Sequence, residues 1–153
     1  MIKILVSKCL YGHNTVRYDG KDYALNDPRF LKWKEEGRMI PVCPEVMGGL
    51  PVPRPPGERL GDRILNKDGT DVTKEYTVGA KQAVKLAINE EVTFALLKLN
   101  SPSCGSKLIY DGSFTGTKIP GQGITTELLR ASGYVVYGED DLDIIEKLIN
   151  EEE

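Results

Sequence analysis

The pattern of apolar and polar residues predicts short buried strands that alternate with amphipathic helices. Residues 2–6 form an apolar run, rich in β-branched side chains, that is typical of a buried strand. Similar runs at 39–42, 94–99 and 134–137 predict three further strands. Buried strands separated by helical segments indicate a mainly parallel sheet with helices on both faces. The predicted fold class is therefore α/β, a three-layer Rossmann-like domain.

Capping residues and helical periodicity predict where the helices lie. Asp27 and Pro28 are suited to the N-cap and first turn of a helix, and Gly37 is suited to its C-terminal end. Apolar residues at helical spacing predict three further helices, one capped by Thr73 with its apolar face reaching Ile88, one over 125–131, and one over 142–149.

The connecting segments contain two predicted hairpins and one rigid loop. Asp68-Gly69 is a turn signal that predicts a hairpin over 63–72, and Asp111-Gly112 predicts another over 107–118. Five prolines between 44 and 56 argue against a helix or the interior of a sheet, so we expect a rigid loop there.

Length and charge narrow the class of protein. The chain has 153 residues, which is an ordinary size for one domain, so we expect a single domain over 1–153. A net charge of −3 and a pI of about 5.3 argue against binding to duplex nucleic acid. The N-terminal apolar run is too short for a signal peptide, and no stretch approaches the roughly 20 apolar residues of a membrane span. We therefore expect a cytoplasmic protein that does not bind membranes.

The three cysteines fall at corresponding places in this pattern. Cys9 lies just past the first predicted strand, Cys43 at the end of the second, and Cys104 a few residues past the third. The carboxyl ends of parallel strands meet at one edge of a sheet, where ligands bind in open α/β folds. An odd number of cysteines in a cytoplasmic chain also argues against a disulfide framework. We expect the three thiols to share one site.

Three thiols in one crevice fit several chemistries, which the residues alone leave open. They could hold three irons of a [4Fe–4S] cluster and leave the fourth iron open as a Lewis acid. They could instead hold zinc in a hydrolase, or belong to a module that binds a cluster or sulfide without catalysis. Cys9 could also act alone as a nucleophile, and the cysteines could simply be small buried side chains.

Polar residues near the cysteines are candidates for proton transfer and substrate binding. Glu45 follows Cys43 closely and would suit a general acid or base. Ser101 and Ser103 lie in a stiff, hydroxyl-rich loop that could donate hydrogen bonds to sulfur or to a substrate oxygen. Arg17 and Arg54 could contact a carboxylate, a phosphate or a nucleobase edge. Each candidate also has a simpler explanation. Glu45 could face solvent, the serines could belong to an ordinary turn, and the arginines could form structural ion pairs.

Five motifs together resemble the thiouracil desulfurase family, formerly a domain of unknown function of the YbbK type. The resemblance covers nearly the whole chain, with the motifs in the expected order. The motifs are Lys8-Cys9-Leu10-Tyr11-Gly12, Arg17-Tyr18-Asp19-Gly20, Cys43-Pro44-Glu45 with Gly48-Gly49-Leu50, Pro53-Arg54-Pro55-Pro56, and Ser101-Pro102-Ser103-Cys104-Gly105. The resemblance implies an enzyme that removes sulfur from thiolated uracil without a redox change.

The resemblance also implies a cofactor and a set of site residues. It implies a [4Fe–4S] cluster held by Cys9, Cys43 and Cys104, with the substrate sulfur on the open iron while water attacks the ring carbon. It implies that Glu45 and Ser101 transfer protons, with Ser103 as the alternative serine. Some relatives carry a second domain and act on thiolated RNA. Because we expect a single domain here, we expect a small-molecule substrate, a thiolated base or nucleoside.

Overall fold

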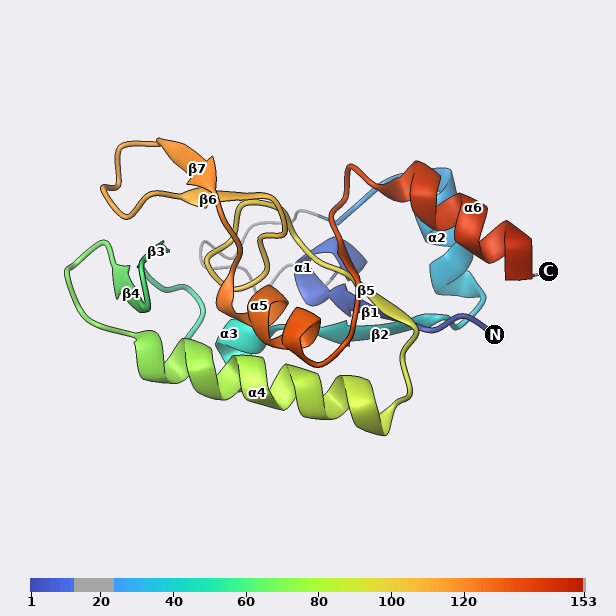
Figure 1. Cartoon of the computed structure of the whole chain (residues 1–153), viewed down its shortest axis with the longest axis horizontal. Helices are drawn as coiled ribbons and strands as arrows, with labels where there is room; N and C mark the ends of the chain where they lie inside the picture. The colour runs from blue at the N-terminus through green and yellow to red at the C-terminus, as the bar shows by residue number, and fades with distance from the viewer. Residues whose placement is uncertain (13–23, 153) are drawn as a thin grey trace.

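A four-stranded parallel sheet forms the centre of the molecule (Figure 1). The structure is a computed structural model that describes residues 1–12 and 24–152. The strand order is β2-β1-β5-β8, and Ile4 of β1 lies opposite Met39 of β2 and Phe94 of β5. The strands are β1 (Ile4–Ser7), β2 (Met39–Val42), β5 (Phe94–Leu96) and β8 (Val136–Tyr137).

Helices cover both faces of this sheet, which confirms the predicted three-layer α/β fold. Figure 1 shows α2 (Pro28–Glu35) and α6 (Leu142–Glu152) on one face, and α4 (Thr73–Asn89) and α5 (Ile124–Ala131) on the other. Successive residues of β1 point to opposite faces, so Ile4 and Val6 pack in one core cluster and Leu5 packs in the other. The pattern explains why the strands read as continuous apolar runs.

Two helix starts show how local sequence determines an element. At α2 the prediction is confirmed, because the Asp27 side chain accepts a hydrogen bond from the Arg29 amide at 2.8 Å and Pro28 opens the helix. At α4 the helix begins at Thr73, but the predicted cap is wrong. The Thr73 hydroxyl instead accepts a hydrogen bond from the Ile64 amide at 2.9 Å, which ties α4 to a neighbouring strand.

The prediction of a rigid loop over 44–56 is wrong for its first four residues. Pro44–Met47 form a short helix, α3, and Lys8–Tyr11 form another, α1. Proline is compatible with the first turn of a helix, where its missing N–H would have no partner, so Pro44 opens α3.

Two hairpins lie beyond the carboxyl edge of the sheet. A hairpin forms at the predicted place, but its bounds differ from 107–118, as β6 (Leu108–Tyr110) pairs antiparallel with β7 (Lys118–Pro120) and Asp111-Gly112 only begin the loop between them. The prediction over 63–72 is wrong in its main pairing, because β4 (Arg63–Asn66) pairs with the preceding β3 (Gly57–Leu60). The turn after Asn66 does form, closed by the Asn66 amide and the Thr70 carbonyl at 2.9 Å.

Helix α3 is held against α4 by direct backbone contact. A Cβ atom built on Gly48 would overlap the Glu75 carbonyl, and one built on Gly79 would overlap the Pro44 carbonyl. Only glycine at both positions allows the two helices to approach so closely. Within the described residues, none of the helices combines the length and the apolar content that crossing a bilayer requires.

Candidate active site

The carboxyl edge of the sheet opens into a cavity of about 390 Å³ that all three cysteines line. Cys9 lies in α1 directly after β1, Cys43 directly follows β2, and Cys104 lies in the connection after β5. All three are within the described residues and none forms a disulfide. The structure therefore brings together thiols that are far apart in the sequence, at the edge where ligands bind in open α/β folds.

Burial strongly disfavours negative charge on these thiols. Burial raises the pKa of Cys9 to about 11, and the neighbouring Cys43 adds to the effect. Burial likewise raises the pKa of Cys43. It also raises the pKa of Cys104, although a hydrogen bond from Ser7 lowers that pKa by a smaller amount. Three thiolates at this site would therefore need a positively charged partner, and iron or zinc is the usual partner of such sulfur ligands.

One metal ion and a larger metal cluster place different demands on the spacing of their sulfur ligands. The sulfur ligands of one tetrahedral zinc ion lie about 3.8 Å apart, as bonds of about 2.3 Å require. In the ranges 1–12 and 24–152, no group of three or more His, Cys, Asp or Glu side chains is placed to hold one metal ion. In an iron–sulfur cluster, by contrast, each cysteine binds a different iron.

Backbone contacts fix Cys104 at the cavity. The Ser101 hydroxyl oxygen accepts hydrogen bonds from the amides of Ser103 and Cys104, both at 3.0 Å. The Thr126 hydroxyl donates to the Cys104 carbonyl at 2.8 Å. A Cβ atom on Gly123 would come within 2.7 Å of the Cys104 nitrogen. Because glycine has no Cβ atom, α5 can begin close beside this loop.

The structure separates the two candidate serines. Ser101 lines the cavity. Because its oxygen already accepts two amide hydrogen bonds, its own O–H remains available to donate. Ser103 is fully buried away from the cavity, and its hydroxyl bonds with that of Thr125 at 2.8 Å. Arg17, the other predicted contact, lies outside the described residues.

Glu45 is held at the cavity by two donors on one oxygen. Arg54 Nε donates to Glu45 Oε1 at 3.1 Å, and the Tyr76 hydroxyl donates to the same atom at 2.8 Å. Arg54 also donates to the Pro51 carbonyl at 3.1 Å, and its side chain is only 4% exposed. Arg54 therefore positions Glu45. The bonds from Arg54 and Tyr76 both reach Oε1, and among residues 1–12 and 24–152 no hydrogen bond to Oε2 is found.

Lys98 and Glu139 form an ion pair at the cavity that the sequence analysis missed. Lys98 Nζ lies 2.7 Å from Glu139 Oε2, and Glu139 Oε1 accepts from the Leu99 amide at 2.6 Å. Lys98 lines the cavity, and its charge lowers the pKa of Cys9, against the larger effect of burial. The position of Glu139 just after β8, at the carboxyl edge of the sheet, was the available signal.

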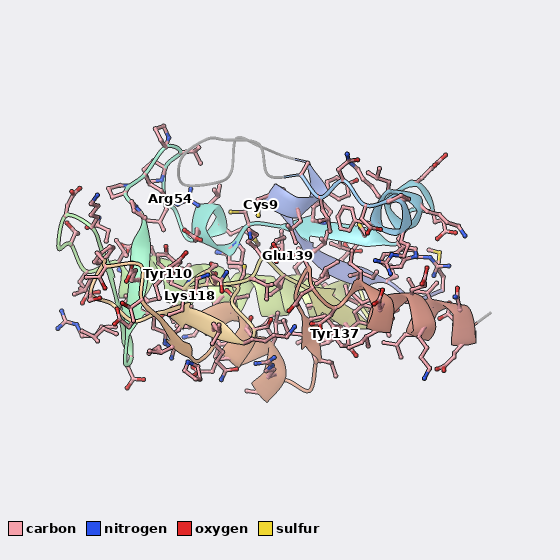
Figure 2. The ribbon with its side chains drawn as sticks, turned by 90° about the horizontal axis from the view of Figure 1, so that it is seen from above. Cys9, Arg54, Tyr110, Lys118, Tyr137 and Glu139 are labelled. Carbon is pink, nitrogen blue, oxygen red and sulfur yellow. The ribbon has the colours of Figure 1, made fainter. Side chains whose placement is uncertain are left out.

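The β6–β7 hairpin contributes an aromatic wall. Tyr110 and Phe114 both line the cavity. Figure 2 shows Tyr110 and Lys118 together on this hairpin, with Arg54 and Cys9 beside α3, and Lys118 Nζ lies 5.6 Å from the centre of the Tyr110 ring. A carboxylate, three thiols and aromatic rings thus surround one space, an arrangement suited to a planar heterocycle.

Comparison with known proteins identifies close similarity over nearly the whole chain. A family model described as 2-thiouracil desulfurase matches residues 4–141. The uncharacterized protein YbbK of Bacillus subtilis (strain 168) is 40% identical over 152 residues, covering 93% of this chain and 99% of its own. A solved structure of TudS, a [4Fe-4S]-dependent thiouracil desulfidase, aligns with a TM-score of 0.94 at 45% identity, covering 98% of this chain and 99% of the other. These matches confirm the resemblance that the sequence motifs indicated.

Proposed function

Because this chain belongs to the 2-thiouracil desulfurase family, we propose that it removes sulfur from thiolated uracil in a [4Fe–4S]-dependent reaction. The proposed substrate is the free base or its nucleoside, taken up in the cytoplasm, where thiols stay reduced. In the net reaction water supplies the oxygen, the C=S bond becomes C=O, and sulfur leaves as hydrogen sulfide. Neither carbon nor sulfur changes oxidation state, so no electron donor is needed.

The single observation that carries the proposal is that Cys9, Cys43 and Cys104 line one cavity. We assign these three thiols as the cluster ligands. Iron is a suitable partner because it binds soft sulfur atoms and because its positive charge offsets that of the buried thiolates. When bound, the cluster supplies an iron with an open coordination position, a Lewis acid that can bind the substrate sulfur.

Glu45 and Ser101 are the residues we assign to proton transfer. With Oε1 held by Arg54 and Tyr76, Glu45 can take a proton from the attacking water at Oε2. The Ser101 hydroxyl, whose oxygen is saturated by two amides, can donate its hydrogen bond to the departing sulfur or to a ring oxygen. The proton taken by Glu45 is then returned to the sulfur, and the second proton comes from the hydroxyl on the ring carbon as the C=O bond forms, so both protons of water leave with the sulfur as hydrogen sulfide.

The test is an anaerobic assay of 2-thiouracil and 2-thiouridine with cluster-reconstituted protein, which follows uracil or uridine, and sulfide. We expect about four irons and four sulfides per chain. Alanine at any of the three cysteines should abolish cluster binding and turnover, and Glu45→Gln should keep the cluster but lower kcat by about 10²–10⁴-fold.

Two serine variants provide a matched comparison. Ser101→Ala should lower kcat strongly, whereas Ser103→Ala, which loses only the bond with Thr125, should lower stability and leave kcat near that of the wild type. Fully loaded protein that releases no sulfide would refute the proposed reaction and leave a module that binds a cluster without catalysis. Turnover by zinc-loaded protein that contains no iron would favour the hydrolase.

A further inference from the structure

Glu58 is a buried carboxylate at the cavity to which the proposed reaction gives no role. It lies on β3, lines the cavity and is 8% exposed. Its Oε1 accepts hydrogen bonds from the amides of Gly112 and Phe114, at 3.0 and 3.1 Å. Among the described residues Glu58 has no ion-pair partner, so these two amides offset the cost of burying its charge.

The two hydrogen bonds that Glu58 accepts help to hold the loop of the β6–β7 hairpin in an unusual conformation. Gly112 has a φ of 95° and Phe114 a φ of 58°, and the second value is rare for a residue with a bulky side chain. Backbone in this region persists only where surrounding contacts enforce it, and it is frequent at ligand sites. Glu58 supplies two of these contacts from outside the hairpin, beside the hydrogen bonds within the loop, and the Phe114 side chain lines the cavity.

The second oxygen of Glu58 accepts no hydrogen bond from the residues that the structure describes, although the side chain lines the cavity. We propose that this oxygen accepts a hydrogen bond from a ring N–H of the substrate that flanks the reacting carbon, while Phe114 packs beside the ring. This inference rests on the proposed function, and it makes Glu58 a residue that determines substrate specificity. Thiolated uracil has such N–H donors, and a carboxylate is a strong acceptor for them.

The substrate chemistry gives a test that begins with the wild-type protein. In 2-thiouracil, N1–H and N3–H flank the C–S carbon, and the 1-methyl and 3-methyl derivatives each lack one of them. We expect one derivative to bind the cluster-loaded protein about 10- to 100-fold more weakly than 2-thiouracil, the range for a lost hydrogen bond to a charged group. We expect the other derivative to bind about as well as the parent. Titration calorimetry measures all three affinities without requiring turnover.

Glu58→Gln then identifies the acceptor. Its amide oxygen can still accept from the amides of Gly112 and Phe114, but its NH₂ replaces the free acceptor with a donor. The variant should bind 2-thiouracil about 10- to 100-fold more weakly, and should no longer discriminate against the disfavoured methyl derivative. Glu127→Gln is the matched control. Glu127 forms an ion pair at 3.1 Å with Arg59, which follows Glu58 on β3, but Glu127 does not line this cavity.

Equal affinity losses of Glu58→Gln for all three compounds would overturn the inference, because Glu58 would then act only through the loop. Unchanged affinity for 2-thiouracil would overturn it as well. The failure of the proposed function is distinct, since wild-type protein that binds 2-thiouracil but releases no sulfide would refute desulfuration while the binding comparison still tests Glu58.

Discussion

Replacing Gly79 with alanine sets helix propensity against packing at the crossing of α3 and α4. In the interior of a helix alanine is favoured over glycine by about 1 kcal/mol, so α4 considered alone should become more stable. In the folded protein the added Cβ would overlap the Pro44 carbonyl oxygen, and would come within 2.7 Å of its carbon and 3.1 Å of the Gly48 nitrogen. These are backbone atoms, which cannot rotate away as a side chain would, so α3 must shift.

The magnitude follows from the two opposing effects. Overpacking by one methyl group costs about 1–3 kcal/mol, and contact with rigid backbone favours the upper end of that range. After the gain of about 1 kcal/mol in propensity, we expect a net loss of about 1–2 kcal/mol in the free energy of unfolding. Because α3 carries Glu45 and directly follows Cys43, the shift should also lower kcat by 10-fold or more, since a displacement of about 1 Å can cost about 100-fold.

Urea unfolding of the cluster-free protein, followed by circular dichroism, measures the first effect, and the thiouracil assay measures the second. Val78→Ala is the matched control, since Val78 is the preceding residue of α4 and is 39% exposed. It should change the free energy of unfolding by no more than about 0.5 kcal/mol. A Gly79→Ala protein that is more stable than the wild type and fully active would refute the proposed role of this crossing.

Two further predictions concern residues around the cavity and its hairpins. Tyr76→Phe removes the 2.8 Å hydrogen bond to Glu45. We expect kcat to fall about 10-fold and the pH profile of kcat to shift, while KM stays nearly unchanged. An unaltered kcat would exclude a positioning role for Tyr76. Hydrogen bonds from Thr73 and then Arg63 lower the pKa of Asp71 to about 2, so between about pH 4 and pH 2 Asp71 is protonated more in the unfolded chain than in the folded chain. The stability contributed by Asp71 is therefore present above about pH 4 and is lost as the pH falls towards 2. Asp71→Asn should flatten this acid limb in urea unfolding between pH 5 and 2, and an unchanged slope would contradict the assignment.

The central fold and the meeting of the cysteines could be predicted because both depend on local, repeating patterns. Continuous apolar runs identify strands buried on both faces, and Cys9 and Cys43 follow two of them directly. Parallel strands then bring their carboxyl ends to one edge without any further information. The family and the enzyme class followed from motifs spread along the whole chain, and the comparisons confirm both.

The rest depends on contacts between distant segments, which a single sequence does not specify. Tyr76 has the spacing of a core residue, and its hydroxyl partner Glu45 comes from another helix. Glu58 lies 54 residues from Gly112, so its anchoring of the loop leaves no local signal. The hairpin error has a different cause, because turns form at both Gly61-Asp62 and Asp68-Gly69, and β4 makes its main pairing across the first of them while the second closes only a single bridge between Leu65 and Asp71.

The distribution of the three thiols over separate strand connections affects how the protein is assembled in the cell. Compact metal motifs close over a few residues, so a metal can bind a nascent segment and direct its folding. Here Cys9, Cys43 and Cys104 meet only after β1 has paired with both β2 and β5. If these thiols hold the proposed cluster, synthesis must pass residue 104 before the cluster can be inserted, and the machinery that delivers iron and sulfide would act on an already folded apoprotein.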